Sequence, residues 1–109
     1  MNRRRQARAD EPRPIRVGPL ELDRRTRRVR MAGADVALTA KEFDLLALLA
    51  EDAGAVLTRQ EILEAVWDAH WYGPTKTLDV HVASLRRKLG DPTMIETVRG
   101  VGFRLCDPP

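Results

Sequence analysis

Residues 75–90 read TKTLDVHVASLRRKLG, and this stretch determines the fold that we expect for the chain. On a helical wheel of about 100° per residue, its apolar side chains fall in one narrow stripe: Leu78, Val82, Leu85 and Leu89. Such a stripe is typical of an amphipathic helix with one face on a core. Gly90 can end the helix, and the Asp91-Pro92 pair prevents its continuation. We therefore predict one helix from about residue 75 to residue 89.

The opposite side of this predicted helix lacks the mixture of Glu and Lys that solvated helix faces usually carry. It has small residues in its middle, basic residues toward its ends, and one apolar residue, Val80. Small side chains allow close approach to a surface, basic side chains reach phosphates, and a valine can contact a thymine methyl group in the major groove. The candidate DNA-binding residues of this helix are Lys76, Thr77, Val80, His81, Ser84, Arg86 and Arg87. For the helix taken alone, a solvated face with basic residues by chance explains the pattern equally well.

Two shorter helices are predicted before this stretch, and each begins with a capping box. Thr39 and Glu42 stand three residues apart ahead of an apolar stripe, and Thr58 and Glu61 repeat the pattern. A short capped helix followed by the helix of residues 75–89 is the order of a helix-turn-helix, although the loop between them is longer than a tight turn.

A β-hairpin is predicted after the long helix. Residues 95–99 and 102–106 form two strand-like segments around Gly100-Val101-Gly102. Arg99 stands beside this glycine turn, and Thr97 precedes it in the first strand. A thin hairpin tip with one arginine can enter a DNA minor groove, where the potential is negative; an ordinary exposed turn is the alternative. A helix-turn-helix followed by a hairpin is a winged helix.

Before the helices, residues 15–38 alternate apolar and polar side chains between short polar turns. This pattern predicts three or four short antiparallel strands with one buried face and one arginine-rich face in water. Residues 1–14 have no apolar periodicity, many arginines and two prolines, so we interpret them as a flexible linker or tail. The domain itself is expected to span residues 15–107, and its fold class is α+β.

Length and composition exclude several classes of protein. A chain of 109 residues and 12.3 kDa fits one domain. Its longest apolar run, residues 45–50, is far shorter than the roughly 20 residues of a membrane span, so we expect no membrane association. The basic N-terminus has no apolar segment behind it and is not a secretory signal. A single cysteine, Cys106, builds no disulfide within the chain, which fits the cytoplasm.

The formal net charge of +3 can be interpreted only from how the charges are distributed along the chain. Residues 1–16 have six arginines against two acids, and residues 17–32 have five against two. Residues 33–68 are acidic, with eight carboxylates against two basic groups, whereas residues 69–109 have six basic groups against four acids. An acidic middle between basic flanks predicts a domain with one face that binds a partner and an opposite face that does not.

An enzyme is not predicted. His70 and His81 are the only histidines, and no cysteine or carboxylate stands at metal-ligand spacing with them. No serine or cysteine supports a nucleophile–base pair, and the glycines at residues 100–102 belong to the hairpin rather than to a phosphate-binding loop. We expect no metal and no cofactor.

Several motifs, in order, resemble the OmpR/PhoB-type winged-helix domain, over about residues 16–106. They are LTAKEFDLL (38–46), LTR (57–59), VW (66–67), TLDVHV (77–82), LRRKL (85–89) and IETVRGVGF (95–103). The resemblance implies a four-stranded N-terminal sheet, three helices and a C-terminal hairpin wing. It also implies the effector domain of a two-component response regulator, with the helix of residues 75–89 in the major groove of double-stranded DNA and Arg99 in the adjacent minor groove.

The resemblance further implies partners. Two copies are expected head-to-tail on direct repeats. A receiver domain, absent from this chain, and a sensor kinase are expected in the full-length protein, of which this chain is an excised domain or a free-standing relative. Trp71 and Tyr72, in the loop before the long helix, are candidates for contact with RNA polymerase or for packing on the domain. Ser84 stands where some members of the family have a base-reading arginine, so direct readout from this position is expected to be weaker. The competing hypothesis is a winged helix used only for protein–protein contact.

Overall fold

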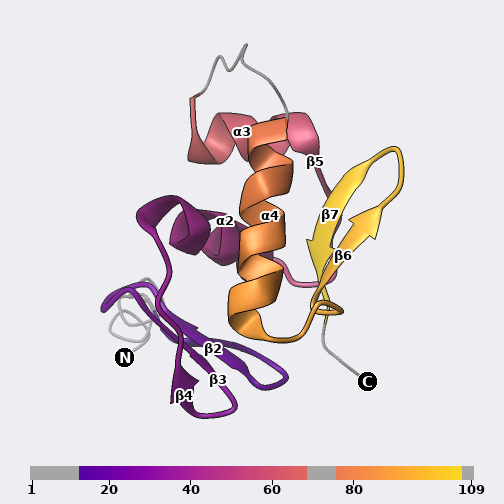
Figure 1. The fold of residues 1–109 in the computed structure, drawn as a ribbon. Coiled ribbons are helices and arrows are strands. Elements are labelled where there is room, and N and C mark those ends of the chain that lie inside the picture. The colour runs from indigo at the N-terminus through magenta and orange to yellow at the C-terminus, as the bar shows by residue number, and fades with distance from the viewer. Residues whose placement is uncertain (1–12, 69–75, 107–109) are drawn as a thin grey trace, which may run out of the picture.

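The computed structural model describes residues 13–68 and 76–106 (Figure 1). Its N-terminal part is an antiparallel sheet of four strands in chain order: β1 (Ile15–Val17), β2 (Leu20–Asp23), β3 (Arg28–Met31) and β4 (Ala34–Asp35). Because side chains alternate along a strand, Leu22 and Val29 are buried, whereas Arg28 and Arg30 are exposed. The four-stranded sheet and its arginine-rich outer face are therefore confirmed. The alternation continues to Leu38 in the sequence, but β4 ends at Asp35, and Val36 and Leu38 pack on the core in the connection to the first helix.

Three helices follow: α2 (Ala40–Glu51), α3 (Arg59–Val66) and α4 (Lys76–Leu89). Thr39 and Thr58 are the N-caps of α2 and α3, and both predicted capping boxes are formed. Four side chains of α4 are buried, and they are the four of the predicted stripe: Leu78, Val82, Leu85 and Leu89. Gly90 follows α4 with a φ of +77°, a left-handed conformation that glycine adopts without steric cost and that ends the helix.

The chain ends in the predicted hairpin, formed by β6 (Ile95–Val98) and β7 (Gly102–Leu105). A short strand that the sequence did not predict, β5 (Leu57–Thr58), pairs with β7 and makes a three-stranded sheet in the order β5-β7-β6. Two residues are too few for a detectable alternation, and their partner lies more than forty positions later in the chain. Because β7 is the middle strand, the hairpin is anchored to the start of α3.

One apolar core joins the N-terminal sheet, the helices and the C-terminal hairpin. Figure 1 shows α4 in the centre, with α2 on one side and the hairpin on the other. This arrangement confirms the winged-helix fold and leaves one side of α4 beside the hairpin without another element over it. No helix among residues 13–68 and 76–106 is long and apolar enough to cross a bilayer.

Candidate nucleic-acid interface

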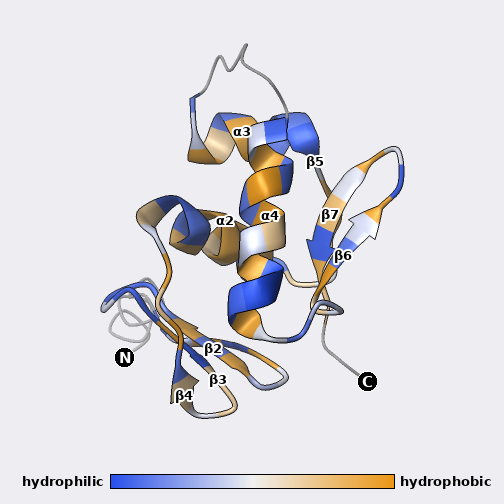
Figure 2. Cartoon of the chain, viewed as in Figure 1, coloured by the Kyte–Doolittle hydropathy of each residue, from blue (hydrophilic) through white to orange (hydrophobic). Residues whose placement is uncertain are grey.

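The exposed side of α4 combines basic, small and apolar side chains. Lys76, Ala83 and Arg87 are exposed, and Val80 retains 64% of its accessible surface, which is unusual for a large apolar residue. Figure 2 shows the last turns of α4 as strongly hydrophilic, while more apolar residues interrupt the polar ones above. In the part of the chain that the structure describes, Lys76 has no ion pair. This side of α4 is therefore positive and has an apolar centre, as expected for contact with a polyanion.

The tip of the hairpin lies beside this surface (Figure 1). The backbone N–H of Val101 donates to the Val98 oxygen at 2.9 Å and closes the turn, with Gly100 at a φ of +77°. Arg99 is exposed and makes no ion pair with a described residue, and Val101 is 48% exposed. The tip thus presents an unneutralised cation and an apolar side chain on a narrow two-stranded support.

Arg86 lies between α4 and the hairpin rather than on the outer side of α4. Its Nε and Nη2 donate to the backbone oxygen of Ile95 at 3.1 and 2.6 Å, and Nη2 also donates to Thr97 Oγ1 at 2.8 Å. The structure therefore brings two of the predicted site residues, Arg86 and Thr97, into direct contact with each other.

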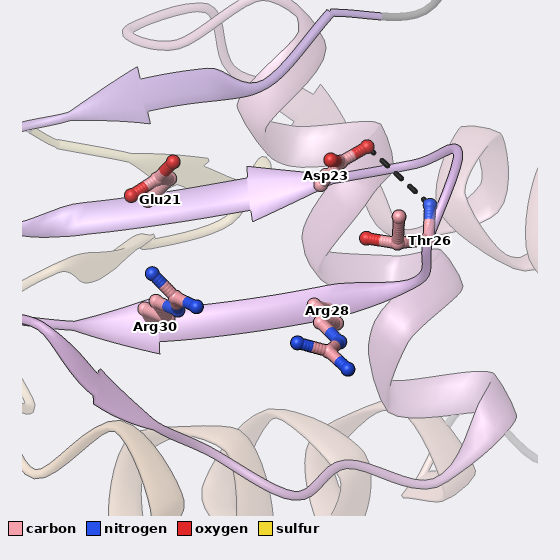
Figure 3. A pocket seen from close by; sticks show the side chains of 5 residues that line it. All are labelled: Glu21, Asp23, Thr26, Arg28 and Arg30. Atoms are coloured by element: carbon pink, nitrogen blue, oxygen red, sulfur yellow. Dashed lines mark hydrogen bonds between the residues drawn. The ribbon is translucent and has the colours of Figure 1, made fainter.

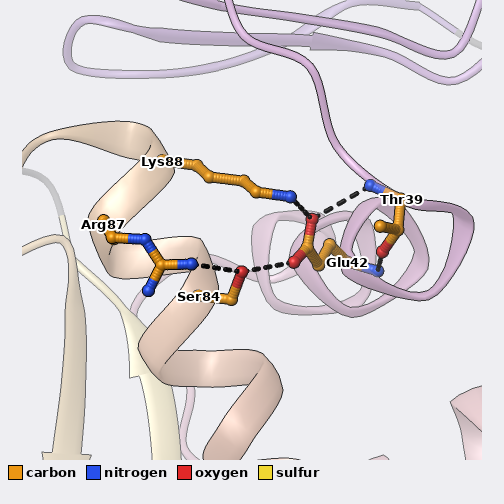
Figure 4. Close-up of polar contacts among 5 residues, drawn as sticks. All are labelled: Thr39, Glu42, Ser84, Arg87 and Lys88. Atoms are coloured by element: carbon orange, nitrogen blue, oxygen red, sulfur yellow. Dashed lines mark hydrogen bonds and ion pairs between the residues drawn. The ribbon is translucent and has the colours of Figure 1, made fainter.

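Ser84 points toward α2 instead of away from the protein (Figure 4). Its hydroxyl donates to Glu42 Oε2 at 2.5 Å, and Arg87 Nη2 donates to the same hydroxyl at 3.4 Å. Because the only proton of Ser84 is already donated to Glu42, the residue has no donor left for a base or a phosphate. The weaker direct readout expected from position 84 stays a prediction.

Glu42 is a buried carboxylate that sequence reasoning did not connect with α4. It is 4% exposed and accepts hydrogen bonds from the Thr39 backbone N–H at 2.9 Å, from Ser84, and from Lys88 Nζ at 2.7 Å. Burial alone would raise the pKa of this carboxyl group, but the hydrogen bonds from Lys88, Ser84 and Thr39 lower it from the ordinary value of 4.5 to about 2. In the sequence, the capping box at the start of α2 already explains why a glutamate stands at position 42. The residues around Glu42 therefore gave no sign of a partner on α4.

His81 and Thr77 lie on the flank of α4 that faces α3. The His81 Nδ1 atom is 2.8 Å from the Thr77 backbone oxygen, and the imidazole ring meets the edge of Trp67 with centroids 4.9 Å apart and planes at 80°. Both residues are half-buried. They border the exposed surface of α4 rather than forming its centre.

Arg59 is a second residue that sequence reasoning missed. Its Nη1 lies 2.5 Å from Asp79 Oδ1, and its guanidinium carbon is 4.9 Å from the centre of the Phe103 ring. It thus compensates the single carboxylate on the exposed side of α4 and links α3, α4 and the hairpin. Asp79 is an acid on an otherwise basic helix face, and this feature of the sequence could have indicated a basic partner such as Arg59.

Trp71 and Tyr72, the candidates for contact with RNA polymerase, lie outside the described residues.

A hollow of about 370 Å³ on the outer face of the N-terminal sheet is lined by charged residues and one threonine (Figure 3): Glu21, Asp23, Thr26, Arg28 and Arg30. Asp23 accepts the backbone N–H groups of the following turn, and Arg30 pairs with Asp35, so these groups have structural partners already. Within residues 13–68 and 76–106, no cluster of three potential metal ligands is present.

Comparison with known proteins identifies similar sequences. Residues 33–105 match the family described as "Transcriptional regulatory protein, C terminal". The chain is 53% identical over 94 residues to the transcriptional regulatory protein PrrA of Mycobacterium tuberculosis, covering 84% of this chain and 40% of that protein. It is 42% identical over 95 residues to the sensory transduction protein RegX3 of Mycolicibacterium smegmatis, covering 84% of this chain and 42% of that protein. The chain thus spans about two fifths of the length of these curated relatives.

Solved structures are similar in fold over most of the chain. The Klebsiella pneumoniae RstA DNA-binding domain, in complex with the RstA box, has a TM-score of 0.80 at 32% identity, covering 88% of this chain and 99% of that one. The DNA-binding domain of the response regulator AdeR, in complex with an intercistronic region, has a TM-score of 0.76 at 30% identity, covering 86% and 99%. DrrB of Thermotoga maritima, described as an OmpR/PhoB homolog, has a TM-score of 0.80 at 29% identity, covering 96% and 49%.

Proposed function

The chain belongs to the family of transcriptional regulatory protein C-terminal domains, and from this premise we propose that it binds double-stranded DNA sequence-specifically as the effector domain of a response regulator. The observation that carries the proposal is the positive, partly apolar side of α4 beside a hairpin tip with an unpaired arginine. Similar domains of RstA and AdeR were solved with DNA, which supports the same activity here. The family is a class of transcription regulators rather than of enzymes, and we propose no catalytic role.

In the proposed complex α4 lies in the major groove and the hairpin tip in the adjacent minor groove. Val80 and Ala83 are the side chains on α4 small or apolar enough to meet base edges, while Arg99 is the cation that reaches the narrow groove. The remaining proposed contacts are to phosphates, and they come from the rim of the surface: Lys76, Thr77, His81, Arg87 and Thr97.

The wider assembly is also proposed. Receiver and effector domains together would account for the length of PrrA and RegX3, of which this chain covers about two fifths. We propose phosphorylation of such a receiver by a sensor kinase, binding of two copies head-to-tail on direct repeats, and contact of Trp71 and Tyr72 with RNA polymerase. Since the proposed partner is chromosomal DNA, the proposed site of action is the cytoplasm.

Binding to duplex DNA is expected to weaken strongly with salt. If one copy neutralises about 4–6 phosphates, a plot of log affinity against log salt concentration has a slope of about −4 to −5 per copy. Lys76→Ala should weaken all duplex sequences to a similar extent and reduce the magnitude of the slope by about 0.9, because a phosphate contact carries no sequence information. Fluorescence anisotropy of a labelled duplex at several salt concentrations measures both the affinity and the slope. Absence of binding at low salt would exclude DNA binding and leave the protein–protein alternative.

Arg99→Ala is expected to reduce affinity for the preferred duplex by about 1–3 kcal/mol, since it removes the only cation at the hairpin tip from the minor groove. Arg25→Ala is a matched control, because Arg25 is also exposed, has no ion pair among the described residues and lies in the turn between β2 and β3. Titration of the same duplex with each variant measures the two affinities, and only Arg99→Ala should lose affinity. An Arg99 variant that binds as tightly as the wild type would remove the hairpin tip from the interface.

A further inference from the structure

Arg86 is held within the protein by more hydrogen bonds than any other cation of α4. Its guanidinium group makes two contacts with the Ile95 oxygen and one with the Thr97 hydroxyl, all between 2.6 and 3.1 Å. Ile95 belongs to β6, which is an edge strand of its sheet, so Arg86 supplies a donor that no neighbouring strand supplies there. Moving this guanidinium to a phosphate would break all three hydrogen bonds.

The Thr97 hydroxyl is left with a proton to donate. A hydroxyl group has one donor and two acceptor positions, and Thr97 Oγ1 accepts from Arg86 Nη2. No other hydrogen bond of this hydroxyl occurs among the described residues, and Thr97 is exposed. A hydroxyl that accepts from a cation is polarised and becomes a stronger donor. Phosphate oxygens only accept, so the free proton of Thr97 suits them.

The places of Thr97 and Arg86 in the fold also connect their contact with DNA binding. Thr97 is two residues before Arg99 on the same strand, and Arg86 is on the helix proposed to enter the major groove. The contact between them therefore joins the two elements that must fit adjacent grooves of one duplex. Arg87, the next residue on α4, is exposed, and among the described residues it has only the 3.4 Å contact with Ser84.

We propose that Arg86 is a positioning residue that acts through Thr97: it holds the hairpin against α4 and orients the Thr97 hydroxyl to donate its proton to a DNA phosphate. Thr97 is then the phosphate ligand, and Arg86 touches no phosphate itself. The inference rests on the proposed binding of duplex DNA and assigns separate tasks to two residues of that interface.

A double-mutant cycle with Arg86→Met and Thr97→Val tests this assignment. Methionine retains an apolar stem without the guanidinium, and valine matches the shape of threonine without the hydroxyl. The probe is a labelled duplex that the wild-type chain enriches from a random-sequence library. We expect each single variant to bind about five- to tenfold more weakly, corresponding to the loss of one charge-assisted hydrogen bond. The double variant should bind within about twofold of Arg86→Met alone, because the Thr97 hydroxyl is no longer oriented toward the phosphate once the guanidinium group is gone.

The salt dependence provides an independent measurement. Arg86→Met should leave the slope of log affinity against log salt unchanged, whereas the control Arg87→Met should reduce its magnitude by about 0.9, as expected for loss of a direct phosphate contact. Thr97→Ser, which retains the hydroxyl and does not alter Arg86, should bind like the wild type even if Arg86→Met is too unstable to assay.

Three results would overturn the assignment: additive losses in the double variant, a reduced salt slope for Arg86→Met, or equal binding by Thr97→Val and Thr97→Ser. Each of them would leave DNA binding itself intact. A wild-type chain that enriches no duplex at low salt would instead refute the proposed function, and the role of Arg86 with it.

Discussion

Gly102→Ala is expected to destabilise the domain by about 3–4 kcal/mol, because a side chain at this position has no space. A Cβ atom on Gly102 would overlap the Leu57 oxygen and would lie 2.8 Å from the Leu57 carbonyl carbon and 2.9 Å from the Thr58 Cα. All three are backbone atoms and cannot rotate away as a side chain would. The pairing of β5 with β7 must therefore open, and the hairpin loses its anchor at the start of α3. Urea unfolding followed by circular dichroism measures the loss.

Gly100→Ala is the matched control in the same hairpin. Gly100 has a φ of +77°, and a Cβ atom added to it would have no neighbour within 4 Å, so alanine there meets backbone strain but no collision. That strain costs about 1–2 kcal/mol. Equal losses in the two variants would show that the close approach at Gly102 does not limit stability.

Glu42→Gln is expected to reduce the free energy of unfolding at pH 7 by about 3 kcal/mol. The carboxylate is buried and accepts from Thr39, Ser84 and Lys88, and a neutral amide of the same size cannot accept from all three. Removing the charge also leaves Lys88 beside a buried site without its partner. The magnitude follows from the pKa of Glu42, which is lowered from 4.5 to about 2 in the folded protein.

The same loss should disappear at low pH. Because the folded pKa lies below the unfolded value, the contribution of Glu42 to stability is complete above about pH 4.5 and is lost as the pH falls toward 2. Unfolding experiments at pH 7 and near pH 3 should therefore show a smaller difference between wild type and Glu42→Gln at the lower pH. A difference independent of pH would contradict the assigned charge state.

Glu61→Gln separates this network from simple helix capping. Glu61 occupies the equivalent position in the capping box of α3 and accepts from the Thr58 N–H at 2.8 Å, but it is exposed. Its replacement should cost no more than about 1 kcal/mol. If both glutamine variants lost the same stability, the contacts of Glu42 with α4 would contribute nothing beyond the cap.

Much of the fold was predictable from the sequence because its signals are local. The threonine–glutamate pairs set the starts of α2 and α3, the apolar stripe set the buried side of α4, and the glycines around Val101 indicated the hairpin. Each of these signals depends on residues within a few positions of one another, where backbone geometry fixes the spacing. The exposure of Val80 followed from the helical periodicity, and the exposure of Arg99 followed from its place beside the glycine turn.

The candidate site was only partly predictable, since a helical wheel gives the direction of a Cβ atom but not the position of the end of a long or polar side chain. Arg86 and Ser84 fell among the candidate DNA contacts, yet Arg86 donates to the hairpin and Ser84 to Glu42. Their partners are 9 to 42 positions away in the chain.

The sequence by itself therefore determined the order of the elements, the starts of α2 and α3, the end of α4 and its buried face. The tertiary structure decided which polar side chains on α4 remain free for a ligand and which are used within the protein. It also decided that Gly102 must be glycine, since its neighbour Leu57 belongs to a strand with no local signal. The physical reason is that hydrogen-bond partners and close backbone approaches are set where distant segments cross, whereas periodicity and capping are set within a single segment.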